Sequence, residues 1–415
     1  MKYIGYLLII LVNFSSFAQV QEESTTPNYI RSIVFTGNSD YSGNPIIELG
    51  EELNLKFDDI IGDEADYYYS IEHFNYDWTP SELVKSEYLS GIDGVRISNY
   101  NNSYNTLQPY THYQLQIPNK DVNSFKVSGN YIISVYNSAR EVVFSRKFMV
   151  YENLASVAVA IKRSRDLNYV NSKQVVNFEI SSSELLIRNP EKTVKVLILQ
   201  NQNLKEAITV IKPQYTIGND LIYKYDKETS FWAGNEYLQF DSKDVRSPTV
   251  SISRIELKDL YHHYLFTNTS RETEPYTYNP DINGQFVIRT LQGENSDIES
   301  EYIWTHFSLQ NYDPIQGGKI HIYGAFNNFE IDDSTLMQYD KTTGLYENAQ
   351  LFKQGFYNYK YILVREDGSI DDGFISGNFD KTENQYQVLV YFRDLGGRYD
   401  QIIGLGNANS RNITN

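Results

Sequence analysis

The sequence predicts an all-β protein of several β-sandwich domains, and three observations support this. Apolar and polar residues alternate along many short stretches, a pattern typical of half-buried strands. Turn-forming residues separate these stretches at the spacing common in sandwiches. The chain contains 36 tyrosines and 21 phenylalanines, which favour pleated surfaces. At about 100–200 residues per domain, 415 residues correspond to two to four domains.

The first residues are expected to form a secretory signal peptide. Lys2 precedes an apolar run at residues 4–12, and Ser16 and Ala18 are the small residues expected before a cleavage site. The run is far shorter than the ~20 residues that span a bilayer. We therefore assign residues 1–18 to a cleavable signal peptide and expect an exported, soluble mature protein.

Composition excludes several classes of function. The formal net charge of −17 disfavours nucleic acid as a partner, because the phosphate backbone would be repelled. The chain has no cysteine, which removes disulfides, thiolate metal sites, cysteine nucleophiles and an N-terminal lipid anchor.

Residues 19–152 are predicted to form the first β-sandwich domain. Its strands are expected where alternation is clearest, at 52–60, 112–119, 129–137 and 142–152. The aromatic stretch 67–78 contributes another strand, in which Tyr67, Tyr69, Ile71 and His73 share one face. We expect that face to be core and the stretch not to form a single stacking platform.

A second sandwich is predicted at residues 153–304 and a third at 305–415. Alternating stretches of the second include 154–164, 173–181, 192–201, 220–225, 236–242, 250–257, 285–291 and 301–309. The polar residues 267–284 are predicted to be a long loop. A transmembrane β-barrel would also alternate, but these strands are shorter and irregularly spaced, so three consecutive sandwiches are preferred.

The sequence lacks the common catalytic and nucleotide-binding motifs. It contains no G-x-S-x-G elbow, H-E-x-x-H helix, P-loop or G-x-G-x-x-G turn. The adjacent His262 and His263 would face opposite sides of a strand, one half-buried and one solvated, and so could not chelate one metal. The segments 281–284 and 366–373 look like calcium-loop fragments but lack the full ligand spacing.

Three acidic pairs lie beside expected turns, where carboxylates are usually solvated: Asp58-Asp59, Asp332-Asp333 and Asp371-Asp372. We therefore predict no catalytic residues, no cofactor and no metal, and a protein that is not an enzyme.

Residues 319–364 resemble the immunoglobulin-like modules of starch- and glycogen-active proteins. The matching positions are Gly324, Phe326, Asn327, Met337, Asp340, Gly344, Tyr346, Gly355, Tyr357, Tyr359 and Lys360. Phe329 stands one residue beyond the usual place of the tryptophan that begins the sugar-stacking surface. The resemblance therefore implies the fold of the third domain but does not extend to sugar binding.

A second resemblance covers nearly the whole mature chain. Residues 66–119 and 128–136 resemble the first domain of the type IX (type 9) secretion system plug family, and residues 382–404 fit the end of that family. This implies a non-enzymatic periplasmic protein, one copy per translocon. It would bind the giant outer-membrane translocon barrel and seal its pore when neither cargo nor another subunit is engaged. The protein itself would not span the membrane.

The sequence does not identify the partner-binding loops. We select the loop 267–284 as the candidate because it is long, polar and tyrosine-bearing, and single out Thr267, Tyr276, Tyr278 and Asn283. A disordered linker is the competing interpretation. Two other functions stay open: a periplasmic or surface carbohydrate-binding accessory protein that uses the C-terminal module, and a secreted cargo or adhesin.

Overall fold

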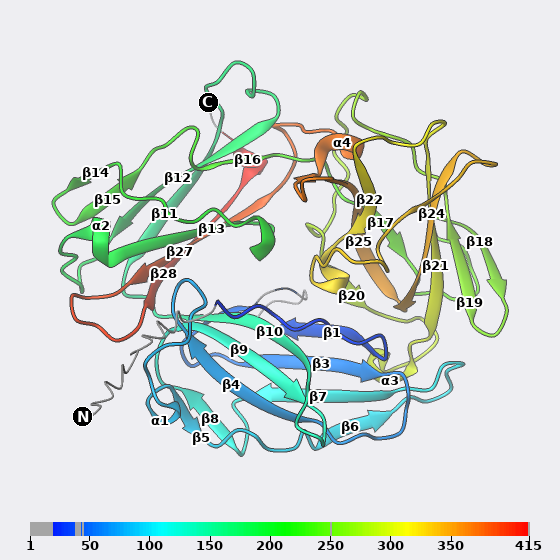
Figure 1. Ribbon diagram of the computed structural model, residues 1–415, viewed down its shortest axis with the longest axis horizontal. Coiled ribbons are helices and arrows are strands. Elements are labelled where there is room, and N and C mark those ends of the chain that lie inside the picture. The colour runs from blue at the N-terminus through cyan, green and yellow to red at the C-terminus, as the bar shows by residue number, and fades with distance from the viewer. Residues whose placement is uncertain (1–19, 38–42, 44, 250, 414–415) are drawn as a thin grey trace, which may run out of the picture.

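The computed structural model describes residues 20–37, 43, 45–249 and 251–413; the expected signal peptide lies outside them. Seven sheets and a few one-turn helices form three packed β-rich domains in this part of the chain (Figure 1). This confirms the predicted all-β, multidomain sandwich fold.

The first domain is a sandwich of two four-stranded sheets, with strand orders β1-β3-β7-β6 and β2-β10-β9-β4, and a small β5-β8 pair. Its elements are β1 (Ile30–Thr36), β2 (Ile46–Glu48), β3 (Leu53–Asp59), β4 (Tyr68–Phe74), α1 (Lys85–Tyr88), β5 (Leu89–Gly91), β6 (Asn99–Asn102), β7 (Thr111–Ile117), β8 (Val122–Phe125), β9 (Gly129–Tyr136) and β10 (Val142–Tyr151).

Aromatic side chains from both sheets form the core of the first domain. Phe57 stacks on Tyr113 with ring centroids 5.0 Å apart and meets Phe144 edge-on at 5.1 Å. The strand face predicted to be core is indeed buried, since Tyr67, Tyr69, Ile71 and His73 are all inaccessible. The tyrosines of this stretch are therefore structural.

The second domain packs the sheet β11-β12-β15-β14, with β16 beside β12, on the sheet β13-β27-β28. Its elements are β11 (Ser156–Arg163), β12 (Lys173–Ser181), α2 (Pro190–Thr193), β13 (Val194–Gln200), η1 (Leu204–Glu206), β14 (Tyr215–Ile217), β15 (Asp220–Tyr223), β16 (Ser230–Trp232), β27 (Gln385–Phe392), β28 (Gln401–Asn409) and η3 (Ser410–Asn412).

The third domain packs the sheet β18-β19-β21-β24-β23 against a sheet centred on β25, which pairs with β17, β20, β22 and β26. Its elements are β17 (Leu238–Asp241), β18 (Ile252–Leu257), β19 (Tyr261–Leu265), β20 (Phe286–Ile288), α3 (Ser296–Glu299), β21 (Tyr302–Gln310), β22 (Gly318–Tyr323), η2 (Ala325–Asn327), β23 (Gln338–Asp340), β24 (Leu345–Lys353), β25 (Gly355–Arg365), β26 (Ile370–Asp371) and α4 (Gly373–Ser376).

The third domain is inserted into the second, which differs from the consecutive division expected from the sequence. The expected boundary at 304/305 falls inside β21, and the final strands return to the second domain, where β27 pairs antiparallel with β13 from Val194↔Phe392 to Gln200↔Tyr386. Alternation reveals that a segment is a strand but not which distant strand it pairs with, so the order of strands along the chain suggested three units in series.

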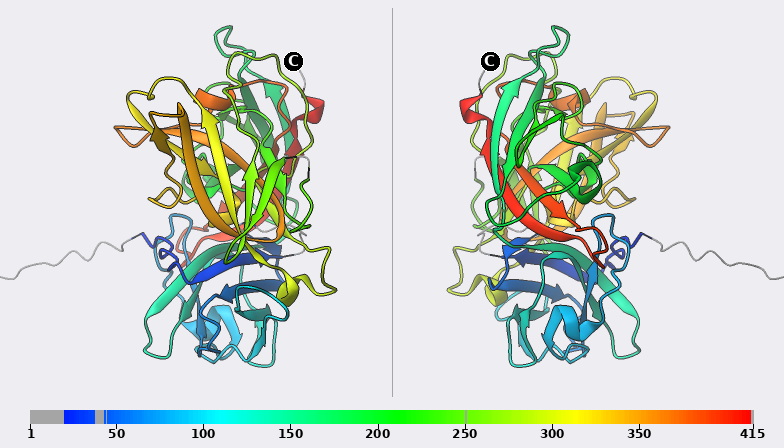
Figure 2. Two further views of the ribbon diagram at one scale, coloured as in Figure 1. Left: turned by 90° about the vertical axis from the view of Figure 1, so that its right-hand side faces the viewer. Right: turned by 90° about the vertical axis from the view of Figure 1, so that its left-hand side faces the viewer.

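The chain enters and leaves the inserted domain at one place. The backbone N–H of Phe379 and the hydroxyl of Thr382 each donate to the carbonyl of Gly234, both at 2.9 Å. Figures 1 and 2 show the result: the second and third domains lie side by side, and the first domain lies across the ends of both.

The insertion predicts how two shortened proteins behave. Removing residues 235–381 and joining Gly234 to Thr382 should leave the first two domains folded, because both sheets of the second domain stay complete. Ending the chain after residue 304 should unfold the second domain, because β27 and β28 are lost. Circular dichroism melting and limited proteolysis distinguish the two; a protease-resistant second domain in the truncated chain would contradict this topology.

Candidate functional site: the domain junctions and an interdomain cleft

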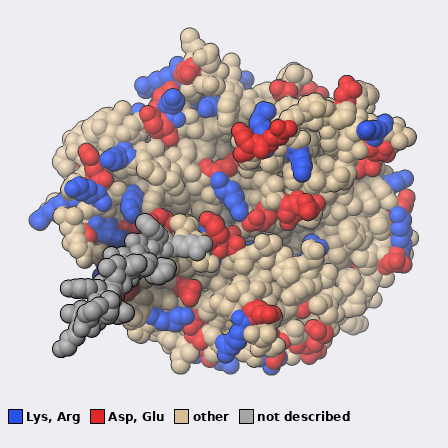
Figure 3. Space-filling model, in the orientation of Figure 1, with Lys and Arg blue, Asp and Glu red and all other residues tan. Residues whose placement is uncertain are grey.

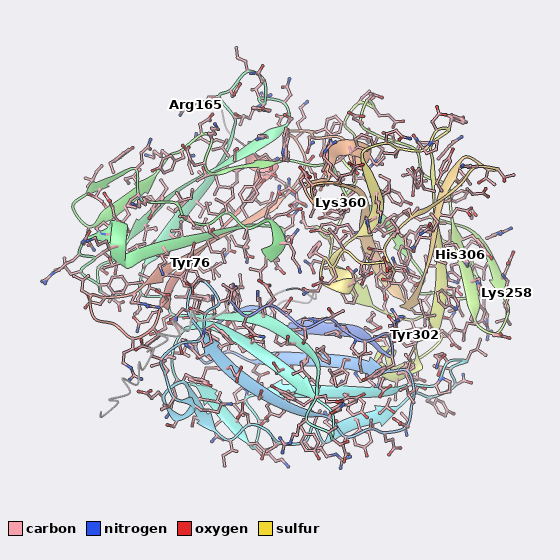
Figure 4. The ribbon with its side chains drawn as sticks, in the orientation of Figure 1. Tyr76, Arg165, Lys258, Tyr302, His306 and Lys360 are labelled. Atoms are coloured by element: carbon pink, nitrogen blue, oxygen red, sulfur yellow. The ribbon has the colours of Figure 1, made fainter. Side chains whose placement is uncertain are left out.

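A buried ionic cluster joins the first domain to the third. Asp58, at the end of β3, accepts hydrogen bonds from Lys353 Nζ at 2.7 Å and from the Tyr302 hydroxyl at 2.6 Å, and His112 Nδ1 lies 2.6 Å from its other oxygen. The side chains of Asp58 and Lys353 are 0% and 1% exposed. Figure 4 shows Tyr302 where the third domain meets the first.

Electrostatics keep this cluster charged. Burial by itself would raise the pKa of Asp58, but the Lys353 ammonium and His112 hold it below its usual value. Burial lowers the pKa of Lys353, against the opposing pull of Asp58. Each ion therefore needs the other, and the two come from different domains.

A second ring of polar contacts surrounds the cluster. Asp297 of α3 accepts hydrogen bonds from Lys56 at 2.7 Å and from Gln114 at 2.9 Å, both on the first domain. Lys353 also donates to the Asp297 carbonyl at 2.6 Å, and its ammonium lies 4.2 Å from the Tyr110 ring centroid. These contacts therefore also join the first domain to the third.

The solvated position predicted for the first acidic pair is wrong. Asp58 and Asp59 are both buried, and Asp59 accepts a 2.7 Å hydrogen bond from Tyr67. Asp58 points away from the core of its own sandwich, as alternation implies, but the third domain covers that outer face.

The other acidic pairs have local partners. Asp371 forms an ion pair with Arg365, and Asp372 forms one with Lys360. Asp332 accepts hydrogen bonds from the backbone N–H and the hydroxyl of Ser334.

The junction of the first and second domains is largely apolar. Its core is formed by Met149, Leu197, Leu199, Leu389, Tyr391 and Ile402. At its edge the Tyr391 hydroxyl donates to Asn130 at 2.7 Å, and the Tyr76 hydroxyl donates to the Val196 carbonyl at 2.9 Å (Figure 4).

Side-chain amides join the second domain to the third. Gln174, wholly buried on β12, donates to the carbonyls of Asp380 and Thr382 at 2.7 and 2.8 Å, in the segment that leaves the third domain. Asn203 donates to the hydroxyl of Tyr323 at 3.0 Å. Each pair of domains therefore shares buried contacts.

The candidate loop 267–284 lies along the third domain and reaches the C-terminal segment of the second. Tyr276 packs on Phe379 with ring centroids 5.7 Å apart and donates to Glu236 at 2.5 Å. Arg271 donates to the Glu236 carbonyl at 3.0 Å. The loop is thus held by specific contacts, unlike the disordered linker considered from the sequence.

The four selected residues have different surroundings. Thr267 and Tyr278 are exposed, Tyr276 is half-buried, and Asn283 is buried with its backbone in the left-handed region, at φ 54°. Tyr278 accepts a 3.3 Å hydrogen bond from Arg411 of the second domain. Only Thr267 and Tyr278 could meet a partner without rearrangement, and partner binding at this loop stays a prediction.

A cleft of about 900 Å³ opens between the second and third domains. Trp232 and Phe231 of β16 line one wall, and Phe374 of α4 lines the other. Glu206 lies in the same cleft, where burial raises its pKa. On the face shown in Figure 3, acidic and basic side chains are interspersed, so the net charge is not gathered there in one patch.

The loop that would carry a sugar-stacking surface faces the first domain. Phe329 is buried against Tyr323, with ring centroids 5.1 Å apart, and Phe326 meets Phe352 edge-on at the same distance. Asn328 of this loop is hydrogen-bonded to Glu23 in the N-terminal segment. Phe329 is thus closed to a ligand, whereas Phe326 is half-buried.

The adjacent histidines lie on opposite faces of their strand, as alternation predicts, but both are more buried than the expected half-buried and solvated pair. His263 is buried, with its Nε2 3.4 Å from the Val245 carbonyl oxygen, which can only accept a hydrogen bond from that ring; His262 is half-buried on the opposite face. In the part of the chain that the structure describes, no group of three or more His, Cys, Asp or Glu side chains is placed to hold a metal ion.

Comparison with known proteins identifies the family. A family model described as the type 9 secretion system plug protein 1st domain matches residues 30–152, the whole of the first sandwich. The chain belongs to the type 9 secretion system plug protein family. This confirms the resemblance found in the sequence.

Similarity to a solved structure extends beyond that first domain. The chain is similar to the crystal structure of a hypothetical protein from Parabacteroides merdae, with a TM-score of 0.89 and 32% identity over 93% of this chain and 98% of that one. The similarity therefore includes the inserted domain. A search of curated proteins found no match. No helix among the described residues is long and apolar enough to cross a membrane.

The ionic junction of this plug-family protein leaves almost no trace in the sequence. Lys56, Asp58, His112 and Gln114 occupy outward positions of an amphipathic sheet, where polar residues normally meet water. The one residue that could have indicated a covered surface was Lys353, a lysine at the end of a strand and next to the buried Phe352. Because the partner domain is distant in sequence, the spacing could not reveal that this face is covered.

The cluster predicts a large difference between two lysine substitutions. Lys353→Met should lower the free energy of unfolding by about 3–5 kcal/mol, because it leaves Asp58 buried without its partner. Lys205→Met removes a pair with Glu330 whose side chains are 41% and 42% exposed, and should change the same quantity by about 0–1 kcal/mol. Urea unfolding measures both; equal effects would show that the buried pair does not hold the junction.

Proposed function

We propose that this protein is the non-enzymatic plug subunit of a type 9 secretion system. It binds the periplasmic side of the outer-membrane translocon barrel and seals its pore when neither cargo nor another subunit is engaged. Family membership supports the assignment, and the observation that carries the sealing role is the mutual locking of the three domains by buried contacts.

Sealing a wide pore is a steric task. A pore that passes folded proteins admits small solutes unless a body of comparable width stays in its mouth. Domains joined by flexible linkers would move independently, whereas an interface with buried ions resists separation because the ions would lose their partners. The Asp58–Lys353 junction and the apolar junction between the first two domains supply that resistance.

The protein is exported by its N-terminal signal peptide, resides in the periplasm on the translocon, and acts as one copy per barrel. The buried polar clusters around Asp58 and Gln174 are engaged in contacts between domains, which supports a structural role for them.

The structure gives little support to carbohydrate binding as the function. It would require the aromatic loop of the third domain, and Phe329 there is 4% exposed and faces the core. A glycan array tests this directly, since specific hits that disappear on changing Phe326 would reinstate the alternative.

Binding is tested by affinity purification. A chromosomally tagged copy, extracted in mild detergent from the native organism, should recover an outer-membrane β-barrel of very high mass in equimolar amount. An untagged strain provides the background. Recovery of the tagged protein alone, under conditions that preserve other envelope complexes, would contradict the proposed partner.

Sealing is tested by permeability. Deleting the gene should increase sensitivity to large antibiotics that the outer membrane normally excludes. Deleting the translocon barrel as well should restore resistance, because the leak passes through that barrel. Unchanged sensitivity in the single mutant, or sensitivity that persists in the double mutant, would contradict sealing.

A further inference from the structure

Two histidines from neighbouring strands meet on the third domain. His262 lies on β19 and His306 on β21, strands that pair in parallel with Tyr264 opposite His306. Nδ1 of His262 and Nε2 of His306 are 2.8 Å apart, and the ring centroids are 5.1 Å apart. Figure 4 shows His306 on this lobe, farther along the same strand as Tyr302 and on the opposite side of the molecule from Tyr76.

Stacked planar groups hold this pair in position. The Tyr264 ring lies parallel to His306, with centroids 4.2 Å apart and an angle of 10°. The Arg254 guanidinium covers the other side of Tyr264 at 3.9 Å from the centroid, and the Tyr264 hydroxyl donates to Glu256 at 3.0 Å. His306 is thereby fixed with its Nε2 directed at His262.

Both imidazoles are neutral at neutral pH. Burial lowers the pKa of His306 to about 4, helped by His262, Lys258 and Arg254. Burial and Lys258 also lower the pKa of His262, while Glu256 and Asp259 oppose the shift. The neutral imidazole is the form that ligates metals.

We propose that His262 and His306 form a bidentate site for a borderline divalent cation such as Zn²⁺ or Cu²⁺. Imidazole nitrogen is a preferred ligand of both ions. The two facing nitrogens come from side chains on one sheet face, and the pair is accessible from solvent because both residues are only half-buried.

The geometry needs little adjustment. Two Zn–N bonds of ~2.0–2.1 Å at a tetrahedral angle place their nitrogens about 3.3 Å apart. The observed 2.8 Å separation must therefore open by about half an ångström, and each ring must turn so that its nitrogen lone pair points at the ion and not at the other nitrogen. In the metal-free pair one ring donates its N–H to the other, so the donor ring changes tautomer when the ion binds and neither ring has to lose a net proton.

The site leaves coordination positions for other ligands. Because no third His, Asp or Glu in the described residues is already in place, water fills the remaining positions. Glu256 stands opposite His262 in the β18–β19 register and is the nearest candidate to turn inward as a third ligand. A cavity of about 590 Å³, lined by His306, Tyr264 and Arg254, adjoins the pair and gives an ion access.

A bound ion would connect β19 to β21. The hairpin β18–β19 is attached to the rest of its sheet through that parallel pairing, which spans Tyr261↔Ile303 to Tyr264↔His306. The ion would therefore stabilise the outermost strands of the third domain. In the sequence His262 stands beside His263, and nothing links it to His306. The two are diagonal neighbours on parallel strands, and such a contact produces no recognisable spacing of residues along the chain.

The experiment is a Zn²⁺ titration of the untagged mature chain at neutral pH, followed by calorimetry, with Cu²⁺ electron paramagnetic resonance as a second measurement. The variants are His262→Gln and His306→Gln. Tyr264→Phe is the matched control, because it keeps the stacked ring and removes only the hydroxyl. Circular dichroism confirms that each variant is folded; His262→Gln, which changes a half-exposed residue, preserves the test if His306→Gln does not fold.

We expect one equivalent of Zn²⁺ to bind saturably to the parent and to Tyr264→Phe. The Cu²⁺ spectrum should show two coordinated nitrogens, and Zn²⁺ should raise the melting temperature. Saturable binding should be lost in each folded histidine variant. Absence of saturable binding in the parent, or undiminished binding in a folded histidine variant, would overturn it.

Discussion

The arrangement of this molecule depends on one buried ion pair, Asp58 with Lys353. A buried carboxylate without a cation is strongly destabilising, so while the first and third domains are packed together neither ion can be lost alone. Tyr302 and His112 use the remaining capacity of Asp58 and fix the orientation of the pair. Separation of the first and third domains would have to hydrate both ions and break these hydrogen bonds together.

The insertion of the third domain extends this constraint to the second. Both connections between the second and third domains pass beside Gly234, so the two cannot diverge without disturbing the Gln174 contacts at the same place. The first domain is then held from two directions, by the ionic junction and by the apolar junction around Leu389 and Tyr391. The result is a single body made of three cores.

A single body of three joined domains suits the proposed sealing role. It also explains why the abundant tyrosines proved to be structural. Tyrosines supply core packing and hydroxyl donors at the junctions, as Tyr67, Tyr302 and Tyr391 do. The paired His262 and His306 differ, because they lie on an outer face away from the junctions and their contacts leave room for an ion.

The sequence by itself determined the class of the fold, many of its strands and the family. Alternation placed the buried face of 67–73 correctly, and local motifs were specific enough to indicate the plug family, because both depend on residues close together in the chain. Tertiary structure decided what depends on distant residues: β27 returns to β13, Asp58 meets Lys353, and the loop 267–284 reaches Arg411. An outward polar residue has the same pattern whether water or another domain covers it, so only the assembled molecule could show which was true.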